Sequence, residues 1–408
     1  MALALRNSLP CLVTALASLA SAPETAHAGE WEVSGSAGLE MRTFLERGAY
    51  PRQLDTFQPS LQLEGDIRWT DAENRWDFVF VPYARLDAKD GDRTHVDARE
   101  AYVRWNGDGW TVRAGLAKVY WGVAESRHLV DIINQFDTVE DIDNEDKLGQ
   151  PMVEISTLQD LGQLTAYVMP AFRKRTFPGE EGRFRTPLLV DNDLARFDGG
   201  RDDNADVDFA LRYSHYFGDW DVGLSFFHGT DRDPRLILDP ARGLFAPYYD
   251  DMTQVGVDIQ YTHEAWLWKF EGIVKDTPFE TFAAAVGGFE YSFYGITESG
   301  ADLGVLMEYQ YDGRSDDPAI APITTADNDL FGGLRLALND AEDTSILGGV
   351  IVDLNDGSMS GLVEASRRFG DYWVVELESR FFANVDNTNI LYGLRKDSQV
   401  TLRLTRYF

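Results

Sequence analysis

The sequence predicts an all-β fold, a transmembrane antiparallel β-barrel of about 18 strands (roughly 16–18). Three observations lead to this prediction: apolar and polar residues alternate from end to end, long loops fall on every second connection, and tryptophans stand beside turns. Beyond residue 28, no stretch approaches the roughly 20 apolar residues that a membrane helix requires. Strands are therefore the elements left to build the fold.

The alternation is clearest in 75–86, where Trp76, Phe78 and Phe80 share one face and Asp77 and Arg85 share the other. A period of two places each set on one face of a sheet. A soluble sandwich gives the same pattern. The pattern predicts strands at 30–44, 56–69, 74–87, 94–106, 109–117, 150–158, 161–171, 205–217, 220–229, 251–263, 266–276, 280–295, 301–312, 328–339, 344–354, 358–369, 372–383 and 399–408.

The loops distinguish a barrel from a sandwich. Connections after even-numbered strands are all tight. Those after odd-numbered strands include all the long loops, at 45–55, 118–149, 172–204, 230–250, 313–327 and 384–398. A membrane barrel of this type has short periplasmic turns and long extracellular loops, whereas a sandwich has no reason to sort its loops.

The tryptophans near predicted strand ends are Trp69, Trp76, Trp105, Trp110, Trp220, Trp266, Trp268 and Trp373. Indole rings favour the level of the lipid headgroups, so this distribution predicts two aromatic girdles. Ordinary packing against turns is the alternative.

The N-terminus has the pattern of a secretory signal peptide over residues 1–28. Arg6 precedes an apolar stretch from Leu9 to Ala22, and the small-x-small site ends at Ala28. Cys11 lies inside this segment, so the mature chain, 29–408, has no cysteine. No linker divides that chain, and we expect one domain that includes 118–149 as a long loop.

The formal net charge of −31 argues against a nucleic-acid partner, because phosphates attract a basic face. Two interpretations of the acidic surplus stay open. It keeps the protein soluble, or it provides an outer surface that binds divalent cations beside lipopolysaccharide.

The chain ends in QVTLRLTRYF, with phenylalanine last and apolar residues at alternate positions before it. This ending resembles that of bacterial outer-membrane barrel proteins. The resemblance implies an insertion signal for the barrel-assembly machinery and a place in a Gram-negative outer membrane, among its lipid and lipopolysaccharide. The residues that fit the signal are Val400, Leu402, Leu404 and Phe408; Arg406 departs from it, although its side chain has the length to reach the interface.

Loop 118–149 contains a predicted short helix at 125–136, with Leu129, Ile132 and Ile133 on one face. General porins are similar in having a third loop that folds into the barrel, where its acidic residues face basic wall residues. By that resemblance the acidic residues of a pore constriction are Asp131, Asp137, Glu140, Asp141, Asp143, Glu145 and Asp146. The expected basic partners on the lumen wall are Arg68, Arg85, Arg104 and Arg113. The alternative is an exposed loop outside the lumen.

The same loop carries WGVAESRHLVDIINQFD, followed by the acidic run and LGQPM. This stretch resembles a poorly characterised proteobacterial family of porin-like outer-membrane proteins. The resemblance covers about 30 residues and implies a barrel. Some members of that family are thought to act with exporters of hydrophobic compounds.

The sequence offers little support for a metal, a cofactor or catalysis. DIDNEDKLG has oxygen ligands but lacks the glycine and distal glutamate of a calcium loop, so only weak surface calcium binding is compatible with it. The histidines form no zinc-binding pair. Ser126 and His128 flank Arg127 without a nucleophile elbow, so we expect no enzyme.

The main functional hypothesis is a channel for diffusion of small hydrophilic solutes, filtered by lumen charges and the inward loop. The second is an outer-membrane component that transports or exports a hydrophobic or specific substrate. The third is an adhesin or structural barrel with a sealed lumen. The sequence leaves the solute, and the choice between monomer and homotrimer, open.

Overall fold

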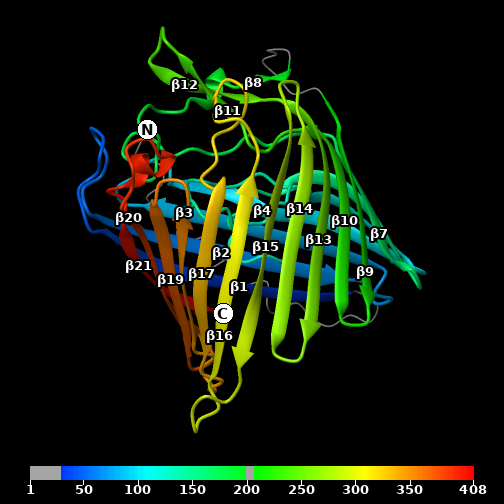
Figure 1. Ribbon diagram of the computed structural model, residues 1–408. Coiled ribbons are helices and arrows are strands. Elements are labelled where there is room, and N and C mark those ends of the chain that lie inside the picture. Colours follow the sequence, from blue (N-terminus) through cyan, green and yellow to red (C-terminus); the bar gives the residue numbers. More distant parts are fainter. Residues whose placement is uncertain (1–28, 199–205) are drawn as a thin grey trace, which may run out of the picture.

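The computed structural model describes residues 29–198 and 206–408. They form a closed antiparallel barrel of 18 strands and a separate sheet of three strands (Figure 1). The predicted signal peptide and its cleavage site near Ala28 lie outside the described residues. No helix in the described ranges has the length and apolar character needed to cross a membrane.

Each barrel strand pairs with the barrel strands before and after it. The barrel strands are β1 (Glu30–Phe44), β2 (Phe57–Thr70), β3 (Trp76–Asp87), β4 (His95–Gly107), β5 (Trp110–Ala117), β6 (Gln150–Gln159), β7 (Gly162–Met169), β9 (Asp208–Phe217), β10 (Trp220–Thr230), β13 (Asp251–His263), β14 (Trp266–Asp276), β15 (Thr281–Phe293), β16 (Asp302–Asp312), β17 (Asn328–Ala337), β18 (Ser345–Asp353), β19 (Met359–Phe369), β20 (Trp373–Ala383) and β21 (Gln399–Tyr407). The predicted all-β barrel, with its strand number, is confirmed.

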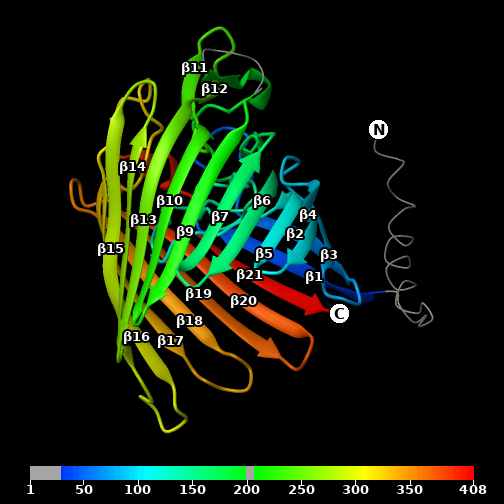
Figure 2. The ribbon, with the colours of Figure 1, turned by 90° about the vertical axis from the view of Figure 1, so that its right-hand side faces the viewer.

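The barrel closes where β1 pairs with β21, from Ser36 opposite Tyr407 to Phe44 opposite Gln399. Figure 2 shows the two terminal strands side by side. Closure leaves the barrel without a free edge whose backbone groups would lack partners.

The loops sort by length as predicted, so the two ends of the barrel differ. At the short-turn end, connections such as 108–109 and 264–265 are two residues long. At the long-loop end, 118–149 links β5 to β6. The small sheet of β8 (Arg196–Phe197), β11 (Arg235–Asp239) and β12 (Leu244–Tyr249) lies at this end (Figure 1).

The wall alternates between an apolar outer face and a polar lumen face. In β1, Leu39 is 44% exposed on the outside, whereas Glu40 is fully buried and Arg42 nearly so. A charge that faces lipid at mid-membrane costs about 2–4 kcal/mol. The period of two therefore directs these charges into the lumen.

The tryptophans gather at one end of the barrel instead of both. All except Trp121, which lies in loop 118–149, stand beside short turns or at the start of β1. Exposed aromatic rings near the long-loop end are those of Phe57, Phe279 and Tyr311. Aromatic side chains therefore stand near both ends, as the predicted two aromatic girdles require, but the second end uses phenylalanine and tyrosine in place of tryptophan.

The C-terminal strand follows the expected pattern of outward residues. Leu402 and Leu404 are exposed on the outer face, and Phe408 exchanges two backbone hydrogen bonds of 3.0 Å with Gly35. The guanidinium of Arg406 lies 5.8 Å from the ring centroid of Trp373. This contact places the one residue that departs from the expected apolar pattern beside an aromatic ring at the membrane interface.

The candidate pore and its inward loop

Loop 118–149 fills part of the lumen. Val130 and Ile133 are completely buried, and both belong to an apolar cluster that also contains Met152 of β6, Phe227 of β10 and Phe282 of β15. A loop outside the barrel could not reach the lumen faces of three such distant strands. The position of the loop therefore depends first on apolar burial.

The first half of the loop is held by two carboxylates of the wall. Glu271 of β14 accepts hydrogen bonds from the backbone N–H groups of Val123 (2.7 Å) and Ala124 (2.9 Å). Glu308 of β16 accepts one from the backbone N–H of Ser126 (2.8 Å) and another from its hydroxyl (2.6 Å). Hydrogen bonds to buried carboxylates are stronger than neutral ones, so they fix the backbone here.

This anchoring explains why the predicted helix at 125–136 is wrong. The structure contains no helical turn in that range. The N–H of Val130 donates to Glu271 at 3.2 Å, and the carbonyl of Ile133 accepts from Arg232 at 3.0 Å. Backbone groups that a helix would pair with each other are instead paired with the wall.

The acidic half of the loop reaches strands on the opposite side of the barrel. Ion pairs join Asp137 to Arg99 of β4 (2.6 Å), Glu140 to Arg85 of β3 (2.5 Å) and Asp141 to Arg42 of β1 (2.8 Å). All six side chains are at most 7% exposed. Together with the contacts to β14 and β16, these pairs fix the loop across the lumen.

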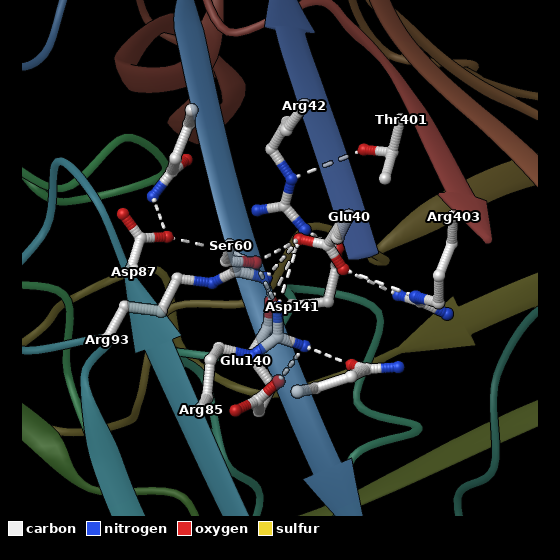
Figure 3. A network of polar contacts seen from close by, with 12 residues as sticks. Glu40, Arg42, Ser60, Arg85, Asp87, Arg93, Glu140, Asp141, Thr401 and Arg403 are labelled. Carbon is white, nitrogen blue, oxygen red and sulfur yellow. Dashed lines mark hydrogen bonds and ion pairs between the residues drawn. The ribbon is translucent and has the colours of Figure 1, made fainter. Parts of the chain in front are cut away.

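Glu40 of β1 is the centre of the network beneath the acidic half (Figure 3). Its carboxylate lies 3.1 Å from Arg85, 2.8 Å from Arg93 and 2.9 Å from Arg403 of β21. Arg93 also donates to the backbone carbonyl of Glu140 at 3.2 Å. One buried carboxylate thus orders the arginines that hold the loop.

A β-bulge contributes Arg99 to this group. Val81 pairs with Glu100 and Pro82 with Ala98, so Arg99 is the extra residue of β4. Pro82 has no N–H to donate, which suits it to a break in the ladder. The bulge brings Arg99 to the lumen face next to Asp137.

Of the four expected basic partners, only Arg85 contacts the loop. The other three pair along the wall: Arg68 with Asp66, Arg104 with Asp77, and Arg113 with Glu154. They lie toward the short-turn ends of their strands, while the loop enters from the other end. Their place is taken by four arginines that were not among the expected partners: Arg42, Arg93, Arg99 and Arg380.

The remaining acidic residues of the loop have different surroundings. Asp131 forms an ion pair with Lys147 of the same loop, and Asp143 pairs with Arg380 of β20 at 2.6 Å. Burial and the neighbouring Asp141 raise the pKa of Asp143 to about 6. Burial raises the pKa of Asp146 to about 7. These carboxyls therefore change charge closer to neutral pH than free aspartates do.

The carboxylate of Glu145 is exposed and lies 3.5 Å from His128. His128 also lies 3.8 Å from Glu271. The contact with Glu145, and to a smaller extent the contact with Glu271, raises the pKa of His128 to about 10. The imidazolium therefore joins the two halves of the loop to the wall at neutral pH.

Two cavities lie between the loop and the wall formed by β17–β20. A cavity of about 840 Å³ starts at the long-loop end, where Ile323 and Leu391 line it. A second cavity, of about 360 Å³, ends near the short turns beside Ala337. Leu347 and Glu364 line both cavities, so the two adjoin there and span the barrel.

Two groups of side chains in the described ranges are close enough to share a metal ion, His95–Asp137–Glu140 and Asp327–Asp329–Asp353. Arginines already contact the first group through Asp137 and Glu140. The segment predicted for weak calcium binding places Asp141 and Asp143 against Arg380. The guanidinium of Arg380 therefore occupies the position that a calcium ion would take between these two carboxylates.

The closed barrel with an inward loop has the fold of a porin-type barrel. It is similar to Wzi, an outer-membrane protein involved in group 1 capsule assembly in Escherichia coli and described as a carbohydrate-binding β-barrel (TM-score 0.54, 9% identity, 98% of this chain and 87% of that one). It is also similar to two proteins of Pseudomonas aeruginosa. With OpdQ the TM-score is 0.51 at 10% identity, over 93% of this chain and 98% of that one. With OccD3 the TM-score is 0.53 at 10% identity, over 95% of this chain and 93% of that one. At these identities the similarity shows the fold alone.

No protein-family model matches the chain, and no curated protein matches it in sequence. The resemblance of the loop to the poorly characterised porin-like family therefore stays a prediction.

Proposed function

We propose that the chain is a channel of the outer membrane that lets small hydrophilic solutes diffuse through the passage between loop 118–149 and β17–β20, and is not an enzyme. The observation that supports this proposal is the pair of adjoining cavities that reaches both ends of the barrel. Water-filled passages of this kind act by size and charge without energy input.

The narrowing element is the loop itself. Its residues Glu125, Asp143 and Glu145 line the same cavity as Glu364 and Arg380 of the wall. A solute in the passage therefore meets loop charges on one side and wall charges on the other. We assign the size limit and the ion preference to this pair of surfaces.

The proposal includes a route to the membrane. The segment 1–28 would direct export and be removed near Ala28, and the last strand, ending at Phe408, would be recognised by the barrel-assembly machinery. Lipid and lipopolysaccharide would surround the outer face, whose apolar residues include Leu39 and Leu402. Monomer and homotrimer both fit this arrangement.

Planar lipid bilayers test the channel. Purified protein is expected to insert in discrete conductance steps, and replacing 125–146 with a short Gly/Ser linker is expected to increase each step. A matched control replaces 240–243, the turn between β11 and β12 at the long-loop end, and is expected to leave the step unchanged. Absence of any conductance from correctly folded protein would contradict the proposal.

The alternative is a component that transports a hydrophobic or specific substrate. Phe331 and Leu362 line the passage and favour it. In that case the variant without 125–146 loses transport of the specific substrate instead of gaining conductance.

A further inference from the structure

The passage has an apolar strip on one side. Phe331 of β17 stands opposite Ile351 of β18, and Leu362 of β19 stands opposite Gly349. All three side chains line the larger cavity. The ring of Phe331 covers Gly349, since a Cβ added to that glycine would lie 2.3 Å from the ring. The strip is therefore continuous across three neighbouring strands.

The apolar strip has no partner in the packing of the loop. The buried cluster beneath the loop contains residues of β5, β6, β7, β9, β10, β13, β14 and β15, and none of β17, β18 or β19. Ile351 and Leu362 stay partly exposed, whereas Phe331 is only 2% exposed and forms the buried base of the strip. Covering apolar surface that faces water lowers the free energy, and a solute in the passage can cover this strip.

An acidic group borders the strip. Glu364 pairs in register with Leu347, lines both cavities and forms no ion pair among the described residues. The nearby cations are already shared: Arg335 contacts Glu125 (2.7 Å) and Glu290 (3.4 Å). Arg380 contacts Asp141, Asp143 and Glu378. Negative charge is therefore left over beside the strip.

From this arrangement we propose that the passage selects organic cations that carry an apolar chain. The ammonium group binds at Glu364, and the chain lies along Leu362 and Ile351. Ser360 pairs with Ile351, and four residues of strand from Glu364 to Ser360 span about 13 Å. The site therefore fits a small amphiphilic amine. This inference rests on the proposed channel function and names its preferred solute class.

The test compares three probes in planar bilayers: hexylammonium, methylammonium and hexanoate. Half-blocking of the current is expected at a concentration at least about tenfold lower for hexylammonium than for methylammonium, because each methylene removed from water strengthens binding about fourfold. Hexanoate is expected to block more weakly than hexylammonium, because Glu364 repels its carboxylate. A protein-free bilayer controls for the effect of hexylammonium on the lipid. Equal block by hexylammonium and hexanoate would overturn the inference.

Two variants separate the contributions of charge and apolar surface. Leu362→Ser is expected to weaken block by hexylammonium about fivefold and leave methylammonium unchanged. Glu364→Gln is expected to weaken block by both cations. Glu32→Gln is the matched control, since Glu32 lines a separate cavity beside β2 and β3 at the short-turn end. Unchanged block in both Leu362→Ser and Glu364→Gln refutes the site, whereas absence of conductance in the unaltered protein refutes the channel instead.

Discussion

The guanidinium of Arg42 lies 2.8 Å from the carboxylate of Asp141, so the first strand of the barrel holds a loop that leaves the wall between β5 and β6. Both side chains are almost completely buried. Breaking a buried pair leaves one uncompensated charge, which is far more costly than the loss of an exposed pair.

Replacing Arg42 with Gln is expected to lower the free energy of unfolding by about 3 kcal/mol, because Asp141 keeps only Arg380 as a basic partner. Urea unfolding in detergent, followed by tryptophan fluorescence, measures the change. Arg68→Gln is the control: its pair with Asp66 is exposed, and its loss is expected to cost about 1 kcal/mol or less. Equal losses in the two variants would mean that the buried pair has no special role.

Replacing Glu271 with Ala is expected to release the first half of the loop. The N–H groups of Val123, Ala124 and Val130 lose their acceptor, at about 1–3 kcal/mol for each group left buried without one. We expect faster protease cleavage within 118–134 and a noisier single-channel current. Glu376→Ala, which removes a partly exposed lumen carboxylate, should change neither. A quiet current and an intact loop in Glu271→Ala would show that apolar packing alone holds the segment.

Acidification is expected to shift the ion preference of the channel away from cations. The pKa of Asp143 is raised to about 6, so lowering the pH from about 8 to about 5 protonates this carboxyl and removes negative charge from the passage. The reversal potential in a KCl gradient measures the effect. Asp143→Asn should begin with a weaker preference and change less over the same range. A preference for cations that grows on acidification contradicts the assignment.

Alkaline pH is expected to remove the contribution of His128. Its pKa in the folded protein, about 10, is above the value of about 6.5 for a free histidine. The stabilisation by Glu145 and Glu271 is therefore complete below about pH 6.5 and is lost as the pH rises through about 10. The difference in stability between the unaltered protein and His128→Gln should shrink over this window. A difference that is constant from pH 6 to pH 11 would exclude an ionic role.

The sequence predicted the barrel well because period-two alternation and loop length are local properties. The region 75–86 already separates Phe78 from Asp77, and no long-range information is needed to see it. The acidic run of loop 118–149 was also visible as a group. Its partners were not, because they depend on which lumen residues lie at the height of the loop, and the stagger of the strands sets that height.

Particular residues show this limit. Arg93 belongs to the connection 88–94, and Arg99 owes its position to a bulge, so alternation assigns neither to the network. Alternation places Glu271 and Glu308 on the lumen face, but it does not identify them as acceptors for a loop backbone. The gathering of tryptophan at one end was not predicted for another reason: nearness of a residue to a strand end does not say which end of the barrel that is.

The pairing of β1 with β21 also constrains how the protein folds. The ion pair between Glu40 and Arg403 crosses this seam and joins residues 363 positions apart in the chain. Contacts so distant in sequence form late, since the entropy lost in closing such a long segment must first be offset by other structure. Glu40 also orders the arginines beneath the acidic half of the loop. We therefore expect the loop to reach its final position only after the last strand has joined the first, so that a half-assembled barrel has no working filter.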